Sequence, residues 1–141
     1  MKRFTIFLLV AVMIFSLTAC GKSNDTAADT SAKGPTYTVD VPELDPNISP
    51  DDYPLIPFDE FEAAFVNLKA ANLNAELDGY QDIADIFGVD GAYYVNCDKE
   101  FGDGLYKYYG WYADNGVSVL ITFKVNGEKL EYFAWTGNNI I

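Results

Sequence analysis

The sequence predicts an α+β domain in which two N-terminal helices pack on a three- to four-stranded antiparallel sheet. Two stretches with apolar residues at helical spacing come first, between residues 58 and 88. From residue 105 onward, apolar and polar residues alternate with a period of two, and the hairpin dipeptide Asn126-Gly127 lies inside this region. Helices followed by strands are typical of a sheet with helices on one face.

The two helices are expected from their ends as well as from their apolar spacing. Residues 59–62 form a D-x-x-E capping arrangement, and residues 78–81 would cap a second, shorter helix that stops at Gly88. The residues expected on the buried faces are Phe61, Ala64, Phe65, Leu68, Ala71, Ile83, Ile86 and Phe87.

A two-residue turn at Asn126-Gly127 would set the register of the last hairpin. Facing residues would then have numbers that add to 253, so that Phe123 faces Leu130 and Ile121 faces Tyr132. This register gathers apolar side chains on one face of the sheet.

The preceding turn, Asp114-Asn115-Gly116, allows two registers. A two-residue Asn-Gly loop would place these residues on the core face: Tyr108, Gly110 and Tyr112. A three-residue loop with Gly116 in the left-handed region would instead place these there: Lys107, Tyr109, Trp111 and Ala113. A slip of one residue exchanges the faces, and the sequence leaves both registers open.

The N-terminus predicts export. Residues 1–19 have a basic start and a short apolar run, as in a secretory signal peptide, and 16 residues from Phe4 to Ala19 are too few for the roughly 20 of a membrane span. Leu17-Thr18-Ala19-Cys20 resembles the bacterial lipobox. The resemblance implies cleavage before Cys20 and a diacylglyceryl group on its sulfur, with acyl chains such as palmitate, which would anchor the chain to the extracytoplasmic face of the cell membrane.

Composition divides the rest into a tether and one domain. Residues 20–57 contain all six prolines and a polar, aperiodic stretch, so we expect a lipidated Cys and a flexible, Pro-rich tether, followed by a small α+β domain at 58–141. Within the tether, residues 36–41 alternate and could add an edge strand to the sheet. Loss of Lys2 and Arg3 with the signal leaves seven basic against 21 acidic residues, a net charge of −14. Such a chain is a poor partner for nucleic acid.

Residue types exclude several chemistries. The chain of 141 residues has no histidine, which removes Ser-His-Asp and Cys-His catalysis and His-ligated zinc. We therefore expect no enzyme, no cofactor and no metal. Cys97 is expected to be a buried thiol, and the acidic loop with Asp98, Glu100 and Asp103 is expected to be a solvated turn, with calcium as a less favoured alternative.

Three short motifs resemble a known family. Residues 80–88, 109–112 and 120–123 are similar to the BamE/SmpA–OmlA lipoprotein domain and to the related repeat of beta-lactamase inhibitor protein. The resemblance implies helices on an antiparallel sheet and a non-enzymatic, protein-binding role. Residues 78–80 lack the Met-Thr that the family usually carries before its second helix.

Aromatic residues crowd the C-terminal half, and some of them should be exposed to solvent, where Tyr and Trp favour binding. The candidate binding residues are Tyr108, Tyr109, Trp111, Tyr112, Phe133 and Trp135. The competing interpretation is that these rings form the core. The sequence thus favours a membrane-anchored domain that contacts an envelope or secreted protein, with a small carboxylate-dependent enzyme acting on cell-wall glycans as the alternative.

Overall fold

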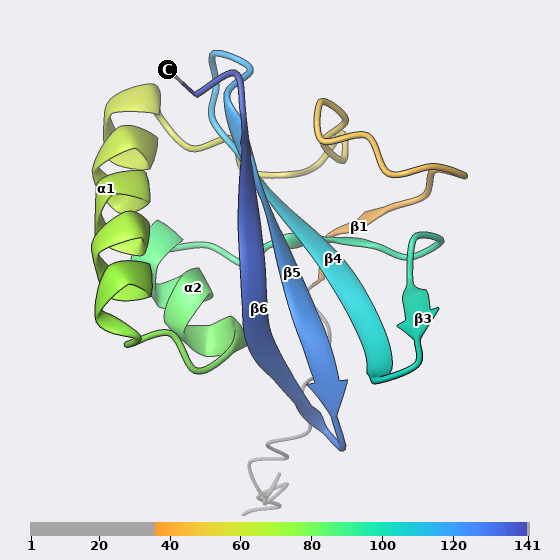
Figure 1. Ribbon diagram of the computed structural model, residues 1–141. Coiled ribbons are helices and arrows are strands. Elements are labelled where there is room, and N and C mark those ends of the chain that lie inside the picture. The colour runs from red at the N-terminus through yellow and green to blue at the C-terminus, as the bar shows by residue number, and fades with distance from the viewer. Residues whose placement is uncertain (1–35, 141) are drawn as a thin grey trace, which may run out of the picture.

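A computed structural model describes residues 36–140, which form a single sheet with two helices (Figure 1). The elements are β1 (Thr38–Val39), α1 (Phe58–Asn74), α2 (Tyr80–Phe87), β2 (Ala92–Tyr94), β3 (Lys99–Phe101), β4 (Gly104–Tyr112), β5 (Ser118–Asn126) and β6 (Lys129–Asn138).

The sheet has six strands in the order β1-β2-β4-β5-β6, and β3 pairs with the start of β4 beside β2. The β1–β2 pair is parallel and the other pairs are antiparallel. The fold-class prediction is therefore wrong, because the sheet is mixed and larger than three or four antiparallel strands. Of its extra strands, β1 lies within residues 36–41, where the alternation allowed an edge strand, whereas the segments at 92–94 and 99–101 are too brief to show a period of two.

The two helices cover one face of the sheet, on the left in Figure 1. Phe61, Phe65 and Leu68 of α1 are buried in a core that also contains Ile83 and Phe87 of α2. On the sheet side this core is formed by Tyr109, Trp111, Ala113, Val117, Val119, Ile121 and Phe123.

The ends of the two helices agree with the sequence predictions to different degrees. Pro57 is the N-cap of α1 and makes no side-chain cap, so the predicted cap at Asp59 is wrong; Asp59 lies in the first turn. Its carboxylate is still favourable there because the helix dipole is positive at that end. The Asp82 carboxylate accepts from the N–H of Gly79 at 2.8 Å, and α2 ends as predicted at Gly88, which has a φ of 71°.

Residues 36–57 are called the strap below; they begin with the edge strand β1, cross the opposite face of the sheet, and end at Ile56, which belongs to the core under the helices. Val39 and Tyr53 of the strap are 3% and 5% exposed, and they pack on Tyr94, Tyr112 and Leu120. The sequence predicts a tether through residue 57, whereas packing against the domain already includes β1 at residues 38–39. The aromatic and apolar residues between the prolines account for this burial, because prolines lower a segment's regularity but do not stop it from packing.

Hydroxyl groups from the sheet hold the strap by its carbonyl oxygens. Tyr94 Oη donates to the Asp45 carbonyl at 2.7 Å, and Tyr112 Oη donates to the Ile48 carbonyl at 2.7 Å. Ser118 Oγ donates to the Pro46 carbonyl at 2.8 Å. The Tyr112 hydroxyl also lies within hydrogen-bond reach of the Tyr94 hydroxyl, and because Tyr94 has a single proton it donates either to the Asp45 carbonyl or to Tyr112. The strap is thus fixed through polar groups that would otherwise be buried without partners.

The turn between β4 and β5 has three residues, 114–116. Gly116 has a φ of 86°, and the N–H of Ala113 donates to the Val117 carbonyl at 2.8 Å. This is the second of the two registers that the sequence leaves open, and it places Tyr109 and Trp111 on the helix face.

The predicted register of the last hairpin is wrong. Asn126 pairs with Lys129, so the turn is centred on Gly127-Glu128, with a φ of 60° at Gly127. The register then shifts opposite Thr122 and Phe123, where Phe133 is the extra residue of a β-bulge. The bulge reverses the side-chain alternation, so that Trp135 pairs with Ile121 on the helix face.

Candidate functional site

Three of the six candidate binding residues are buried. Tyr109 and Trp111 are 1% and 0% exposed, and the Trp111 indole N–H donates to the Val89 carbonyl at 3.0 Å. Tyr112 lies under the strap and is 4% exposed. These residues belong to the core and not to the surface. The register set by the three-residue turn places Tyr109 and Trp111 under the helices, and the strap covers Tyr112.

The other three candidates remain accessible to different degrees. Tyr108 is half-buried and packs against the residues that are buried under the strap. Trp135 is half-buried, with its ring edge-on to Phe65 at 5.1 Å between centroids. Phe133 is 58% exposed; it follows Tyr132, which packs on the helix face, so the alternation of the strand places Phe133 on the opposite face.

Phe133 belongs to a set of three rings that we call the aromatic row: Phe101, Tyr106 and Phe133. Tyr106 is buried at the centre, and its ring stands edge-on to Phe101 at 5.4 Å and to Phe133 at 5.0 Å. The outer rings are both more than half exposed. Sequence reasoning missed Phe101 and Tyr106 as site residues, since their contact depends on β3, which has only three residues.

Ion pairs flank the aromatic row. Lys124 lies 3.0 Å from the Asp103 carboxylate and 5.7 Å from the centre of the Tyr106 ring, and Tyr106 donates to Asp103 at 2.7 Å. The hydrogen bonds from Tyr106 and Lys124 lower the pKa of Asp103, and the bond to Asp103 raises the pKa of Tyr106. The aromatic row is therefore bordered by the Lys124–Asp103 ion pair, whose two charges cancel.

The acidic loop divides its carboxylates between different partners. The Asp98 carboxylate accepts a hydrogen bond from the Tyr93 hydroxyl at 2.8 Å and lies 3.7 Å from the Lys107 ammonium, whereas Asp103 pairs with Lys124. Within residues 36–140, no three His, Cys, Asp or Glu side chains are close enough together to hold a metal ion.

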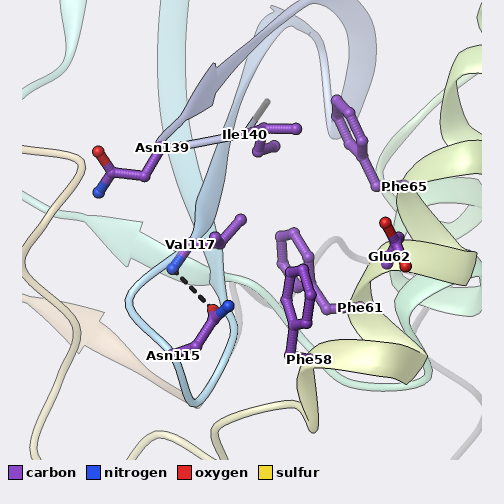
Figure 2. A pocket seen from close by; sticks show the side chains of 8 residues that line it. All are labelled: Phe58, Phe61, Glu62, Phe65, Asn115, Val117, Asn139 and Ile140. Atoms are coloured by element: carbon purple, nitrogen blue, oxygen red, sulfur yellow. Dashed lines mark hydrogen bonds between the residues drawn. The ribbon is translucent and has the colours of Figure 1, made fainter.

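A separate pocket of about 240 Å³ lies where α1 meets the end of β6 and the β4–β5 turn (Figure 2). Its lining residues are Phe58, Phe61, Glu62, Phe65, Asn115, Val117, Asn139 and Ile140. The lining is mainly apolar, and Glu62 is its single ionisable residue. This pocket suits an apolar group better than a polar metabolite.

A wider, shallow depression beside the end of α2 contains two carboxylates. Asp85 accepts the Gln81 amide at 2.8 Å, and Asp90 accepts the Tyr80 hydroxyl at 3.1 Å. Burial raises the pKa of Tyr80, whose oxygen also accepts the N–H of Gly91 at 3.0 Å. Both carboxylates thus serve as hydrogen-bond acceptors for neighbouring groups.

Charge is unevenly distributed over the described chain. Residues 36–97, which form the strap and helices, contain thirteen acidic residues and one lysine. Residues 98–140, which carry the aromatic row, contain six acidic residues and four lysines. The segment that carries the row is therefore much closer to neutral than the segment that forms the strap and the helices.

The remaining predicted features can be placed briefly. Cys97 is 3% exposed, as expected, and burial raises the pKa of its thiol. The signal peptide at 1–19, Cys20 and the first part of the tether lie outside the described residues. Of the helices in residues 36–140, neither has the length and hydropathy needed to cross a bilayer.

Comparisons with protein-family models, with curated proteins and with solved structures found no match to this chain. The resemblance to the BamE/SmpA–OmlA domain and to the beta-lactamase inhibitor protein repeat therefore stays a prediction from three short motifs.

Proposed function

We propose that the protein is a lipid-anchored, extracytoplasmic domain without catalytic activity that binds an envelope or secreted protein through the aromatic row. The observation that carries this proposal is the pair of outer rings, Phe101 and Phe133, which are 56% and 58% exposed beside a buried tyrosine. Large exposed aromatic side chains in contact with one another are typical of protein-binding surfaces.

The energy available at this surface suits a specific contact. An aromatic side chain buries about 150–250 Å² in a core, so the exposed part of Phe133 amounts to roughly 100 Å². At about 25 cal/mol per Å², its burial would contribute about 2–3 kcal/mol to binding. The rigid setting of the ring against Tyr106 lowers the entropic cost of ordering it.

Membrane attachment is the part of the proposal that rests on the N-terminal sequence. Cys20 at the end of the lipobox-like motif would carry the lipid, and the domain would remain outside the cytoplasm. Substituting Cys20→Ser should release the protein from the membrane fraction while its far-UV circular dichroism stays unchanged. A mutant that is still processed and sediments with membranes would contradict the lipid anchor.

The binding surface is tested by photo-cross-linking in the native cells. A benzophenone amino acid placed at Phe133 should form a discrete cross-linked species with another protein, and the matched position Leu73, which is 84% exposed on α1, should not. Phe101→Ala in the Phe133-labelled protein should reduce the yield of that species several-fold. Equal cross-linking from both positions, or no effect of Phe101→Ala, would contradict binding through the aromatic row.

The enzymatic alternative requires two carboxyl groups about 5–10 Å apart that face one substrate. Glu62 is the single acid of the apolar pocket, and the acids of the α2 depression are Asp85 and Asp90. Hydrolysis of purified peptidoglycan by the wild-type chain, lost in Asp85→Asn or Asp90→Asn, would favour this alternative over the binding function.

A further inference from the structure

The outer edge of β6 is unpaired over most of its length in the described part of the chain. The α1–α2 loop covers only its beginning, where the N–H of Tyr132 donates to the Asp78 carbonyl at 3.0 Å. From residue 133 to residue 138, no backbone group of residues 36–140 other than those of β5 bonds to β6. In Figure 1 this strand stands at the front of the sheet with α1 beside it.

The register shows which backbone groups point outward. Because Ala113 N–H bonds to the Val117 carbonyl, the odd-numbered residues of β5 bond to β4 and the even-numbered ones bond to β6. Their β6 partners, which are Ala134, Thr136 and Asn138, therefore point inward. The N–H and C=O groups of Trp135 and Gly137 point to the open edge.

This edge lacks the usual protection against strand addition. Natural edge strands carry charged residues or proline, which discourage pairing with another chain. Residues 132–140 contain neither, although 21% of the whole chain is charged. The bulge at Phe133 marks one end of the open stretch.

The apolar pocket lies at the other end of the same edge. Ile140 returns over Gly137, where a Cβ atom would lie 2.9 Å from Ile140 Cδ1, and Ile140 lines the pocket. Phe65, which also lines the pocket, contacts the ring of Trp135. Figure 2 shows the rings of Phe61 and Phe65 facing Ile140 across the space. A strand added beside Trp135 and Gly137 would direct alternate side chains toward this pocket.

Charge indicates the kind of strand that fits. Glu62 lines the pocket, Asp59 lies one turn before it on α1, and Asp78 lies at the other end of the edge. Lys69, the one lysine among residues 36–97, stands over the Phe65 ring at 4.8 Å. Because these three carboxylates outnumber the single ammonium, a basic segment would be attracted and an acidic one repelled.

We propose that the groove between β6 and α1 binds an extended, basic peptide segment of another protein by strand addition. The backbone of the segment pairs with Trp135 and Gly137, one apolar side chain enters the pocket, and a basic side chain faces Glu62. Main-chain bonds supply affinity and the pocket supplies selectivity, as in other strand-addition sites. The inference is independent of the aromatic row, since Phe133 lies on the opposite face of the sheet.

A selection with random peptides tests the inference. The full chain in detergent is immobilised and screened with a phage-displayed library of random eight-residue peptides. We expect enrichment of sequences with lysine or arginine and one large apolar residue. The strongest peptide is then synthesised, together with a copy that is N-methylated at alternate backbone amides, and the copy should bind at least tenfold more weakly.

Gly137 offers a matched pair of variants. Gly137→Ala and Gly137→Pro both place a Cβ against the flexible end of Ile140, but only the proline removes the outward N–H. Gly137→Pro should therefore bind the peptide about tenfold more weakly than Gly137→Ala, measured at a temperature at which circular dichroism shows both variants folded. Glu62→Gln should weaken binding about threefold and reduce its dependence on salt.

Four outcomes would overturn the inference. They are a screen without enrichment, a peptide whose affinity is the same for both Gly137 variants, dimerisation of the wild-type chain through this edge, and amide protection of Trp135 and Gly137 that disappears when residues 21–35 are deleted. The third would assign the groove to a second copy, and the fourth to the chain's own N-terminal segment.

Discussion

Two tyrosines under the strap should respond in opposite ways to loss of the hydroxyl group. Tyr53 is 5% exposed, and its hydroxyl has no hydrogen-bond partner among the described residues. Burial raises the pKa of Tyr53, as expected for a hydroxyl that is removed from water. The Tyr112 hydroxyl, by contrast, bonds to the Ile48 carbonyl and to Tyr94. The rings of Tyr53 and Tyr112 pack edge-on at 5.3 Å, and phenylalanine would keep that contact.

The expected magnitudes follow from these environments. An unpaired buried hydroxyl costs about 1–3 kcal/mol, so Tyr53→Phe should raise the free energy of unfolding by about 1 kcal/mol. Tyr112→Phe should lower it by about 2 kcal/mol, since two hydrogen bonds are lost. Urea unfolding followed by tryptophan fluorescence measures both changes, and each kcal/mol should move the melting temperature by about 4–8 °C.

The outcome that refutes this reasoning is a loss of stability in Tyr53→Phe. It would show that the hydroxyl is hydrogen-bonded in solution and that the strap sits differently on the sheet. A Tyr112→Phe variant as stable as the wild type would likewise contradict the fixation of the strap by hydroxyl groups.

The remaining predictions concern three other places in the domain. Gly91→Ala should cost about 1–3 kcal/mol, because its Cβ would lie 2.6 Å from the buried Trp111 ring, whereas Gly102→Ala, with open space around it, should change the urea midpoint little. Hydrogen bonds from a tyrosine and a lysine lower the pKa of Asp103, so its contribution to stability is present above the unfolded pKa of about 3.9 and is lost as the pH falls through the folded pKa. Asp103→Asn should therefore flatten the pH dependence of the urea midpoint below about pH 4, and an unchanged slope would contradict this. The Cys97 thiol, buried and with a raised pKa, should react with a thiol reagent only at the rate of unfolding, and fast labelling of the native protein would be inconsistent with its burial.

Local signals predicted local structure well where one residue type decides the geometry. Gly88 ends α2 with a positive φ, as predicted. At Asn115-Gly116 the sequence left two turn lengths open, and the structure has the three-residue turn with a positive φ at Gly116. Asn126-Gly127 misled because Gly127-Glu128 forms an equally short turn one residue later, and a turn signal does not distinguish them. The bulge at Phe133 then depends on packing across the sheet, which no local pattern reports.

The binding surface was harder to predict than the fold elements. Tyr109, Trp111 and Tyr112 are chemically as suitable for binding as Phe133, and only the register and the strap separate them. The packing of the strap was missed because its five prolines indicate an extended segment, and an extended segment either extends into solvent or packs along a sheet. The difference lies in long-range contacts such as those of Tyr53, which sequence spacing does not encode.

The strap also shortens the segment that separates Cys20 from the domain. With residues 36–57 packed on the sheet, at most fifteen residues, 21–35, separate a lipid on Cys20 from the domain. A chain of that length spans no more than about 50–55 Å when fully extended, less than half of the roughly 115 Å allowed by a tether reaching to residue 57. If Cys20 is the anchor, the domain stays within this distance of the membrane. A partner would then have to lie close to the same membrane leaflet, and one deep in the cell wall could not be contacted.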